Sequence, residues 1–270
     1  CAFANNTIEK AEEVLPANLC PLIKSSYGFI VSGTCPFFGL SEAVIAETTC
    51  DGKKKMFEMI SDIKPMYVMD LPQLPDEREA HDNWTVMIKK LRGFLEATFH
   101  TAITDEDVEK EIKDSNIKNE KMNRIFSFAE QKPSVLSWSE IYDLTFLATP
   151  AAGRDIMPLL DDAIEKLEIR VAEGVFFGNL DSPRVLITGC PIGGDATKVF
   201  RIIEEAGGVI VAIDNCTGMK GFADYFEEDT ADPFASVASR YLKIPCSCMT
   251  PNSRRLTELD MMIERFKPDA

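Results

Sequence analysis

The chain has 270 residues, of which 45% are hydrophobic, and a formal net charge of −15 at pH 7. Its length allows one large or two ordinary domains with a real hydrophobic core. The acidic charge argues against a nucleic-acid partner and an anionic membrane surface, because both attract basic proteins. No run of about 18 apolar residues predicts a membrane span.

The first part of the chain predicts a β-α-β unit. Residues 43–48 have the composition of a short strand, and residues 49–52 form a turn. Residues 53–61 show helical spacing of apolar side chains, and residues 66–69 are the next expected strand. Two strands separated by a helix favour a parallel sheet.

The middle of the chain predicts helices. Residues 84–99 are amphipathic, and residues 104–107 have the form of a capping box that begins a helix running to about residue 131. Two more helices are expected at residues 137–147 and 155–176. The mixed charges of this region are typical of solvated helix faces.

A second α/β region begins at Pro183. It alternates strands, turns rich in glycine or asparagine, and helices. The expected elements are a strand at 184–188, a glycine-rich turn at 189–194, a helix at 196–206, a strand at 209–213, a weaker extended segment at 241–244 and a helix at 252–266.

Together these elements predict an α/β fold with two Rossmann-like parallel-sheet domains joined by a helical segment. The expected boundaries are residues 1–80 for the first α/β unit, 81–180 for the helical segment and 181–270 for the second α/β domain. Ligands of open parallel sheets bind beyond the carboxyl ends of the strands. We therefore expect a site between the strand ends of the two domains.

Localisation and chain ends give further expectations. No secretory signal opens the sequence, and disulfide frameworks belong to short secreted chains, so a cytoplasmic protein with few or no disulfides is expected. The sequence begins at Cys1 rather than Met, and it stops after residues 267–269, which should lead into another strand. These features predict a natural chain that continues beyond both ends.

The eight cysteines are the main chemical signal. Cys50, Cys190 and Cys216 follow expected strands within about three residues, and the pair Cys246 and Cys248 follows the weaker extended segment. Many thiols with only two histidines favour iron–sulfur chemistry over a histidine-based metal site. Zinc is the alternative, but paired C-x-x-C motifs are missing.

Several features have two open interpretations. Cys1 and Cys190 are either ligands or small residues that fit their surroundings. The turn at Gly189–Gly194 either cradles a phosphate or simply reverses the chain tightly. Lys53–Lys55 either face an anionic group or form a solvated helix start. The hydroxyls of residues 25–27 either orient a substrate or cap a turn, and the motifs indicate no catalytic side chain.

Four stretches resemble the 2-hydroxyacyl-CoA dehydratase family, also called the benzoyl-CoA reductase type. They are residues 18–28 with Cys20, residues 47–54 with Cys50, residues 187–194 and residues 215–218. The resemblance covers nearly the whole chain. Cysteines beyond the basic set of the family favour its double-cubane branch.

The resemblance implies an iron–sulfur cluster held between α/β domains. Cys20 and Cys50 match two of the three cysteines of the family's 4Fe–4S site, and the third would follow Ala270. An 8Fe–9S double-cubane cluster is the first expectation and needs more thiolates. The candidate ligands are Cys20, Cys35 and Cys50, followed by Cys216, Cys246 and Cys248.

The resemblance also implies partners and a reaction. A separate ATP-hydrolysing iron–sulfur activator would deliver low-potential electrons one at a time. The first prediction is a reductase that acts on a small substrate at the double-cubane cluster. The alternatives are a 2-hydroxyacyl-CoA dehydratase subunit, which eliminates water from an acyl-CoA substrate through a radical, and a non-catalytic electron-transfer protein. A homodimer or heterodimer is expected.

Overall fold

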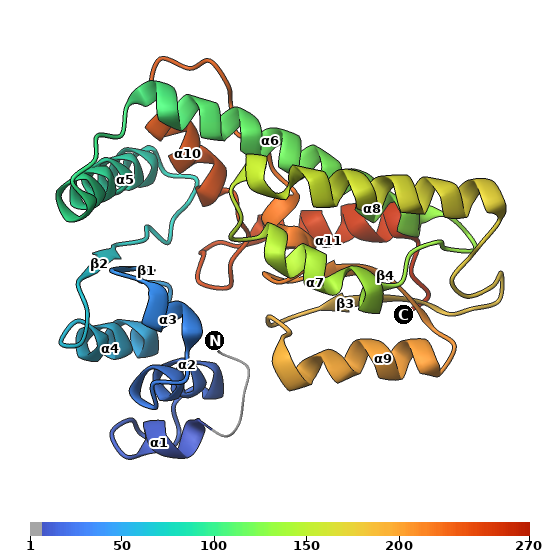
Figure 1. Ribbon diagram of the computed structural model, residues 1–270, viewed down its shortest axis with the longest axis horizontal. Helices are drawn as coiled ribbons and strands as arrows, with labels where there is room; N and C mark the ends of the chain where they lie inside the picture. The colour runs from blue at the N-terminus through green and yellow to red at the C-terminus, as the bar shows by residue number, and fades with distance from the viewer. Residues whose placement is uncertain (1–6) are drawn as a thin grey trace. The chain divides into compact units, whose positions relative to one another are not determined.

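The computed structural model describes residues 7–270, which contain helices and two small parallel sheets (Figure 1). Strand β1 (Val44–Glu47) pairs with β2 (Met66–Met69), and β3 (Arg184–Thr188) pairs with β4 (Val209–Asp214). The predicted α/β class is confirmed. Each described sheet has two strands, and the arrangement as two Rossmann-like domains stays a prediction.

Two compact units divide the chain. Unit 1 extends through Ile103 and includes the short segments Gly193–Ala196 and Cys248–Thr250. Unit 2 contains the remainder, in the segments Thr104–Ile192, Thr197–Ser247 and Pro251–Ala270. The boundaries at residues 80 and 180 that the sequence suggests stay a prediction.

Unit 1 is built around β1 and β2. Its core brings Ala46 of β1 together with Ile23, Phe57 and Ile60 from two helices. On β2, Tyr67 stacks on Phe94 with ring centroids 5.3 Å apart. The helices of unit 1 are α1 (Ile8–Glu12), α2 (Pro21–Val31), α3 (Pro36–Leu40), α4 (Asp51–Ile60) and α5 (Arg78–Phe99).

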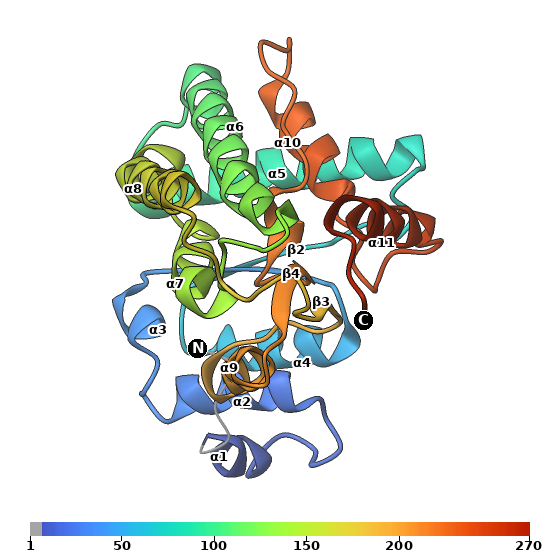
Figure 2. The same ribbon diagram turned by 90° about the vertical axis from the view of Figure 1, so that its right-hand side faces the viewer.

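Unit 2 is built around β4, whose residues are all buried. Helix α9 lies on one side of the β3–β4 sheet, and α6, α7 and α8 lie on the other (Figures 1 and 2). The helices of unit 2 are α6 (Asp105–Ser127), α7 (Trp138–Ala148), α8 (Gly153–Glu173), α9 (Lys198–Glu205), α10 (Pro233–Leu242) and α11 (Ser253–Phe266). Two 3₁₀ turns, η1 (Phe128–Glu130) and η3 (Met219–Phe222), also belong to unit 2. The residues of a third, η2 (Gly194–Thr197), are divided between the two units.

The predicted capping box is present at the start of α6. The Thr104 hydroxyl accepts a hydrogen bond from the Asp107 backbone N–H at 3.1 Å, and the Asp107 carboxylate accepts one from the Thr104 N–H at 2.9 Å. These bonds satisfy two backbone donors that lie outside the helical ladder. The hydrogen bonds to Thr104 also lower the pKa of Asp107.

A buried arginine joins β3 to the ends of other elements. Arg184 donates hydrogen bonds to the carbonyl oxygens of Ala129 at 2.9 Å, Gln131 at 3.0 Å and Phe266 at 2.6 Å. The backbone N–H of Ala270 also donates to the Arg184 carbonyl at 3.2 Å. The last residues of the described chain therefore run beside β3, where the sequence predicts that a strand begins.

The prediction of an extended segment at residues 241–244 is wrong, because Tyr241 and Leu242 belong to the last turn of α10. The Asp232 carboxylate caps this helix by accepting from the Phe234 N–H at 3.1 Å, and Pro233 occupies the first helical position. Phe234, Ala238 and Leu242 are buried four residues apart. That spacing is helical, and it outweighs the local β propensity.

No helix in residues 7–270 is long and apolar enough to cross a membrane.

Candidate functional site

The three cysteines of unit 1 share one structural position. Cys20, Cys35 and Cys50 are the N-cap residues of α2, α3 and α4. Proline follows the first two at the first helical position, where its missing N–H and fixed φ angle suit a helix start. Each thiol therefore stands at the positive end of a helix dipole, which favours negative charge.

The three thiols differ in exposure and in local hydrogen bonding. Cys20 and Cys50 are exposed, and neither side chain makes a capping hydrogen bond. Cys35 is partly buried, and its sulfur accepts a hydrogen bond from the Phe38 N–H at 3.3 Å. None of the three is in a disulfide, so all remain available as ligands.

The first turn of α4 lies close to the residues that flank Cys20. A Cβ added at Gly52 would lie 2.8 Å from Cδ1 of Ile23 and 2.9 Å from Cδ1 of Leu19. A side chain at residue 52 would therefore push against the segment that carries Cys20. This packing holds the N-termini of α2 and α4, and with them Cys20 and Cys50, in the same part of unit 1.

Two further thiols follow the register-paired strands of unit 2. Thr188 of β3 pairs with Asp214 of β4 at the carboxyl end of the sheet, and Cys190 and Cys216 each come two residues later. Both cysteines are exposed and in no disulfide. The strand-end placement predicted for these two residues is confirmed.

Polar side chains join the loops of these two cysteines. The Asn215 side-chain amide donates to the Cys190 carbonyl oxygen at 3.1 Å. The Thr217 hydroxyl donates to the Ile192 carbonyl at 2.8 Å and accepts from the Ile192 N–H at 3.0 Å. The Tyr142 hydroxyl donates to the same carbonyl at 2.6 Å, and burial raises the pKa of Tyr142.

Cys246 and Cys248 do not follow a strand, because α10 precedes them. Both are partly buried and in no disulfide. The Cys246 carbonyl accepts a hydrogen bond from the Asn252 side chain at 2.8 Å within unit 2. Cys248 belongs to the short segment of unit 1 in which the Thr250 N–H donates to the Gln73 carbonyl at 2.8 Å.

An ionic cluster at the ends of β3 and β4 was not expected from the sequence. Asp214 is buried between two cations, with Lys220 Nζ at 3.3 Å and Arg255 Nη2 at 3.1 Å from its carboxylate oxygens. The Thr188 hydroxyl donates to the Asp214 carboxylate at 2.8 Å. Asp214, Lys220 and Arg255 come from three different segments, so only the strand-end position of Asp214 could have indicated the cluster.

The lysine run after Cys50 is paired with carboxylates. Lys53 lies 2.7 Å from Glu47, Lys54 lies 3.5 Å from Asp51, and Lys55 lies 2.8 Å from Glu58. These contacts support the interpretation as a solvated helix start. Residues 25–27 lie inside α2 rather than at a turn or cap, and the Ser26 hydroxyl donates to the Leu22 carbonyl of the same helix at 2.9 Å.

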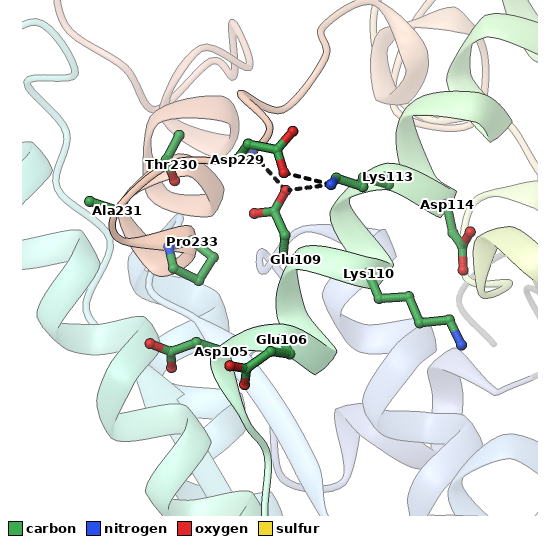
Figure 3. Close-up of a pocket in the computed structure, with 10 residues that line it drawn as sticks. All are labelled: Asp105, Glu106, Glu109, Lys110, Lys113, Asp114, Asp229, Thr230, Ala231 and Pro233. Carbon is green, nitrogen blue, oxygen red and sulfur yellow. Dashed lines mark hydrogen bonds and ion pairs between the residues drawn. The ribbon is translucent and has the colours of Figure 1, made fainter.

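A surface pocket of about 610 Å³ lies in unit 2 beside the first turns of α6 (Figure 3). Lys113 binds Asp229 at 2.6 Å and lies 3.8 Å from Glu109, whose carboxylate also accepts from the Asp229 N–H at 2.7 Å. Most of the other charged residues that line it are acidic, and none is a cysteine. The pocket is therefore unsuited to an anionic cluster with thiolate ligands.

The comparisons with known proteins concern the whole sequence. The family model described as 2-hydroxyglutaryl-CoA dehydratase, D-component, matches residues 1–270. The chain belongs to this family. It is also 39% identical over 271 residues to an Escherichia coli (strain K12) protein named "Putative dehydratase subunit YjiM". That match covers 100% of this chain and 70% of the relative.

The family to which this chain belongs is associated with iron–sulfur clusters, so its cysteines can be compared with what such a cluster requires of its ligands. The donor type fits, because none of the seven described cysteines is in a disulfide and each is at least partly exposed. Residues 7–270 contain no close group of three or more Cys, His, Asp or Glu side chains that could hold a metal ion. Each thiol is thus a suitable iron ligand by its chemistry, but the described residues do not gather three of them at one point.

Proposed function

We propose that this chain is an iron–sulfur reductase of the dehydratase family, which reduces a small substrate at a double-cubane cluster. Family membership and the matched dehydratase subunit support an enzyme subunit of this type. The observation that carries the finer proposal is the shared position of Cys20, Cys35 and Cys50. Each is a free thiol that begins a helix in unit 1.

The chemistry of these positions suits an anionic, thiolate-bound group. Cys20, Cys35 and Cys50 would bind iron, and the positive helix ends would offset the negative charge of thiolates and sulfides. The Phe38 backbone N–H donates a hydrogen bond to the Cys35 sulfur, and hydrogen bonds to ligand sulfurs adjust the reduction potential of a cluster. Cys216, Cys246 and Cys248 would complete the larger ligand set. When bound, the cluster supplies low-potential one-electron chemistry.

The proposed reaction requires partners. An ATP-hydrolysing iron–sulfur activator would donate the electrons, and the substrate would be a small molecule reduced near the exposed thiols. A second candidate is a dehydratase subunit that acts on a 2-hydroxyacyl-CoA, and the name of the Escherichia coli relative as a dehydratase subunit favours it. A homodimer or heterodimer in the cytoplasm is part of the proposal in either case.

Iron and acid-labile sulfide counts on the anaerobically purified full-length protein would test the cluster. About eight irons per chain would support the double cubane, and about four would favour the dehydratase alternative. Protein purified without iron under these conditions would contradict both. ATP-dependent turnover with the activator would then separate an enzyme from an electron carrier.

Serine substitutions separate the ligand role of these cysteines from their capping role. Serine is a strong N-cap residue but a poor iron ligand, so Cys20→Ser, Cys35→Ser and Cys50→Ser should lower the iron content while leaving the helical circular dichroism unchanged. Cys190→Ser is the matched control, because Cys190 is exposed and free but lies outside the proposed ligand set. Equal iron content in all four variants would contradict the proposed ligands.

A further inference from the structure

Arg255 reaches the carboxyl ends of both strands of unit 2. It lies in the first turn of α11, and its Nη2 atom donates to the Thr188 hydroxyl at 2.8 Å and lies 3.1 Å from an Asp214 carboxylate oxygen. Thr188 and Asp214 are register partners at the ends of β3 and β4. Arg255 is therefore placed at the edge of the sheet where ligands of parallel α/β sheets bind.

Two cations share the carboxylate of Asp214 at this edge. Lys220 lies 3.3 Å from Asp214, and the side chains of both are almost fully buried, with 5% and 3% exposed. Arg255 shares this one carboxylate. Two cations therefore share one carboxylate, and Glu258, which also interacts electrostatically with Asp214, adds a negative charge nearby.

The adjacent residue, Arg254, has more carboxylate partners than Arg255. Arg254 lies 2.6 Å from Asp224 and 2.8 Å from Glu258, so two carboxylates surround its guanidinium group. Arg255 shares one carboxylate with Lys220, and within the described residues its Nε and Nη1 atoms donate no hydrogen bond. About a quarter of its side chain is exposed, at 27%.

We propose that Arg255 binds the oxyanion group, a carboxylate or a phosphate, of a ligand at the carboxyl edge of β3 and β4. A guanidinium group donates charge-assisted hydrogen bonds to such anions. Thr188 and Asp214 both contact Nη2, so the ligand would accept single hydrogen bonds from Nη1 and Nε. The neighbouring loop residues Gly189 and Cys190 are exposed. The site depends on the fold of unit 2 and not on an iron–sulfur cluster.

Calorimetric titration of the full-length protein with inorganic phosphate and, separately, with acetate tests the site. Arg255→Gln should weaken binding by at least about tenfold, the loss expected for one charge-assisted pair. Arg254→Gln, the matched control on the adjacent residue, should change the affinity by less than about twofold. Binding of phosphate alone would indicate a phosphorylated ligand, and binding of acetate alone a carboxylate. No binding of either anion, or an equal loss in both variants, would overturn the proposal.

Chemical labelling of the wild-type protein provides a second measurement if Arg255→Gln does not fold. Phenylglyoxal modifies accessible arginines, and peptide mass mapping reports each site. The anion that binds should protect Arg255 and leave the labelling of Arg254 unchanged, and an absence of selective protection would contradict the site. An iron assay on the same sample separates the proposals. Full iron without anion binding would refute only this inference, and anion binding without iron would refute only the proposed cluster.

Discussion

At the scale of single residues, the cysteines of unit 1 combine two properties of their positions. The turn-forming residues around Cys20, Cys35 and Cys50 place each thiol where a helix begins, and Pro21 and Pro36 fix the direction in which two of those helices start. A thiol at such a position stays accessible, because its side chain projects before the first turn. This is the local reason that free thiols, rather than buried ones, occur here.

Gly52 has the most specific steric role near these thiols. Gly52→Ala would place a methyl group within 3 Å of the ends of Leu19 and Ile23, whereas Gly39→Ala in α3 meets no atom within 4 Å. We expect Gly52→Ala to have a free energy of unfolding about 1 kcal/mol lower than that of Gly39→Ala, because both gain helix propensity but only Gly52→Ala makes these side chains move. Gly39→Ala should be neutral or stabilising by up to about 1 kcal/mol, because alanine favours helices.

Urea unfolding of the two alanine variants, followed by circular dichroism, would measure this difference. Equal stability of the two variants would show that α4 does not approach the Cys20 segment as closely as proposed. Iron content measured on the same samples should fall in Gly52→Ala alone, because this substitution alone displaces the segments that carry Cys20 and Cys50.

At the scale of elements, helix α7 is capped at its N-terminus by a side chain from another helix. Ser137 is the N-cap residue, but its hydroxyl makes no capping bond to the helix. The carboxylate of Glu204 on α9 instead accepts from the Trp138 N–H at 2.9 Å and from the Ser137 hydroxyl at 3.1 Å. A carboxylate from another helix thus satisfies the first donors of α7 and complements its dipole.

Glu204→Ala should therefore lower the stability of unit 2 by about 1 to 2 kcal/mol, the usual range for loss of a helix cap. Glu205→Ala is the matched control, because Glu205 is exposed and, among residues 7–270, pairs with Arg201 alone, at 3.2 Å within α9. A surface pair of this kind contributes less than about 1 kcal/mol. Urea unfolding curves that coincide for the two variants would contradict the capping role of Glu204.

At the scale of the whole molecule, each compact unit has its own hydrophobic core. The core of unit 1 includes Ala46, Phe57 and Ile60, and the larger core of unit 2 is built around β4 and Trp138. The chain has two tryptophans, Trp84 in α5 of unit 1 and Trp138 in α7 of unit 2. Fluorescence can therefore report on each unit separately.

We expect the two units to unfold at different urea concentrations. Trp84→Phe leaves Trp138 as the reporter of an unaltered unit 2, and Trp138→Phe leaves Trp84 as the reporter of an unaltered unit 1. Unit 2 should unfold later by about 1 M urea, because it buries the larger core. Superimposable fluorescence transitions would show that the chain unfolds as one cooperative body.

Much of the local structure could be predicted because its determinants lie within a few residues. The four strands follow short apolar runs, and α6 begins at the capping box that Thr104 and Asp107 form. The last turn of α10 could not be predicted from residues 241–244 alone, because its helix depends on the Asp232 cap and on the buried positions of Phe234 and Ala238. Local propensity loses to packing in such a segment.

Some features of the candidate site could likewise be predicted from the sequence, and others could not. The α/β class and the family could be predicted from the sequence, because composition, short-range periodicity and motifs carry that information. The iron–sulfur role of the thiols stays a prediction. Only the tertiary structure decided that Asn215 joins the Cys190 and Cys216 loops, and that Asp214, Lys220 and Arg255 meet at one sheet edge. These contacts join residues far apart in the chain, and only the folded backbone brings them within hydrogen-bonding distance.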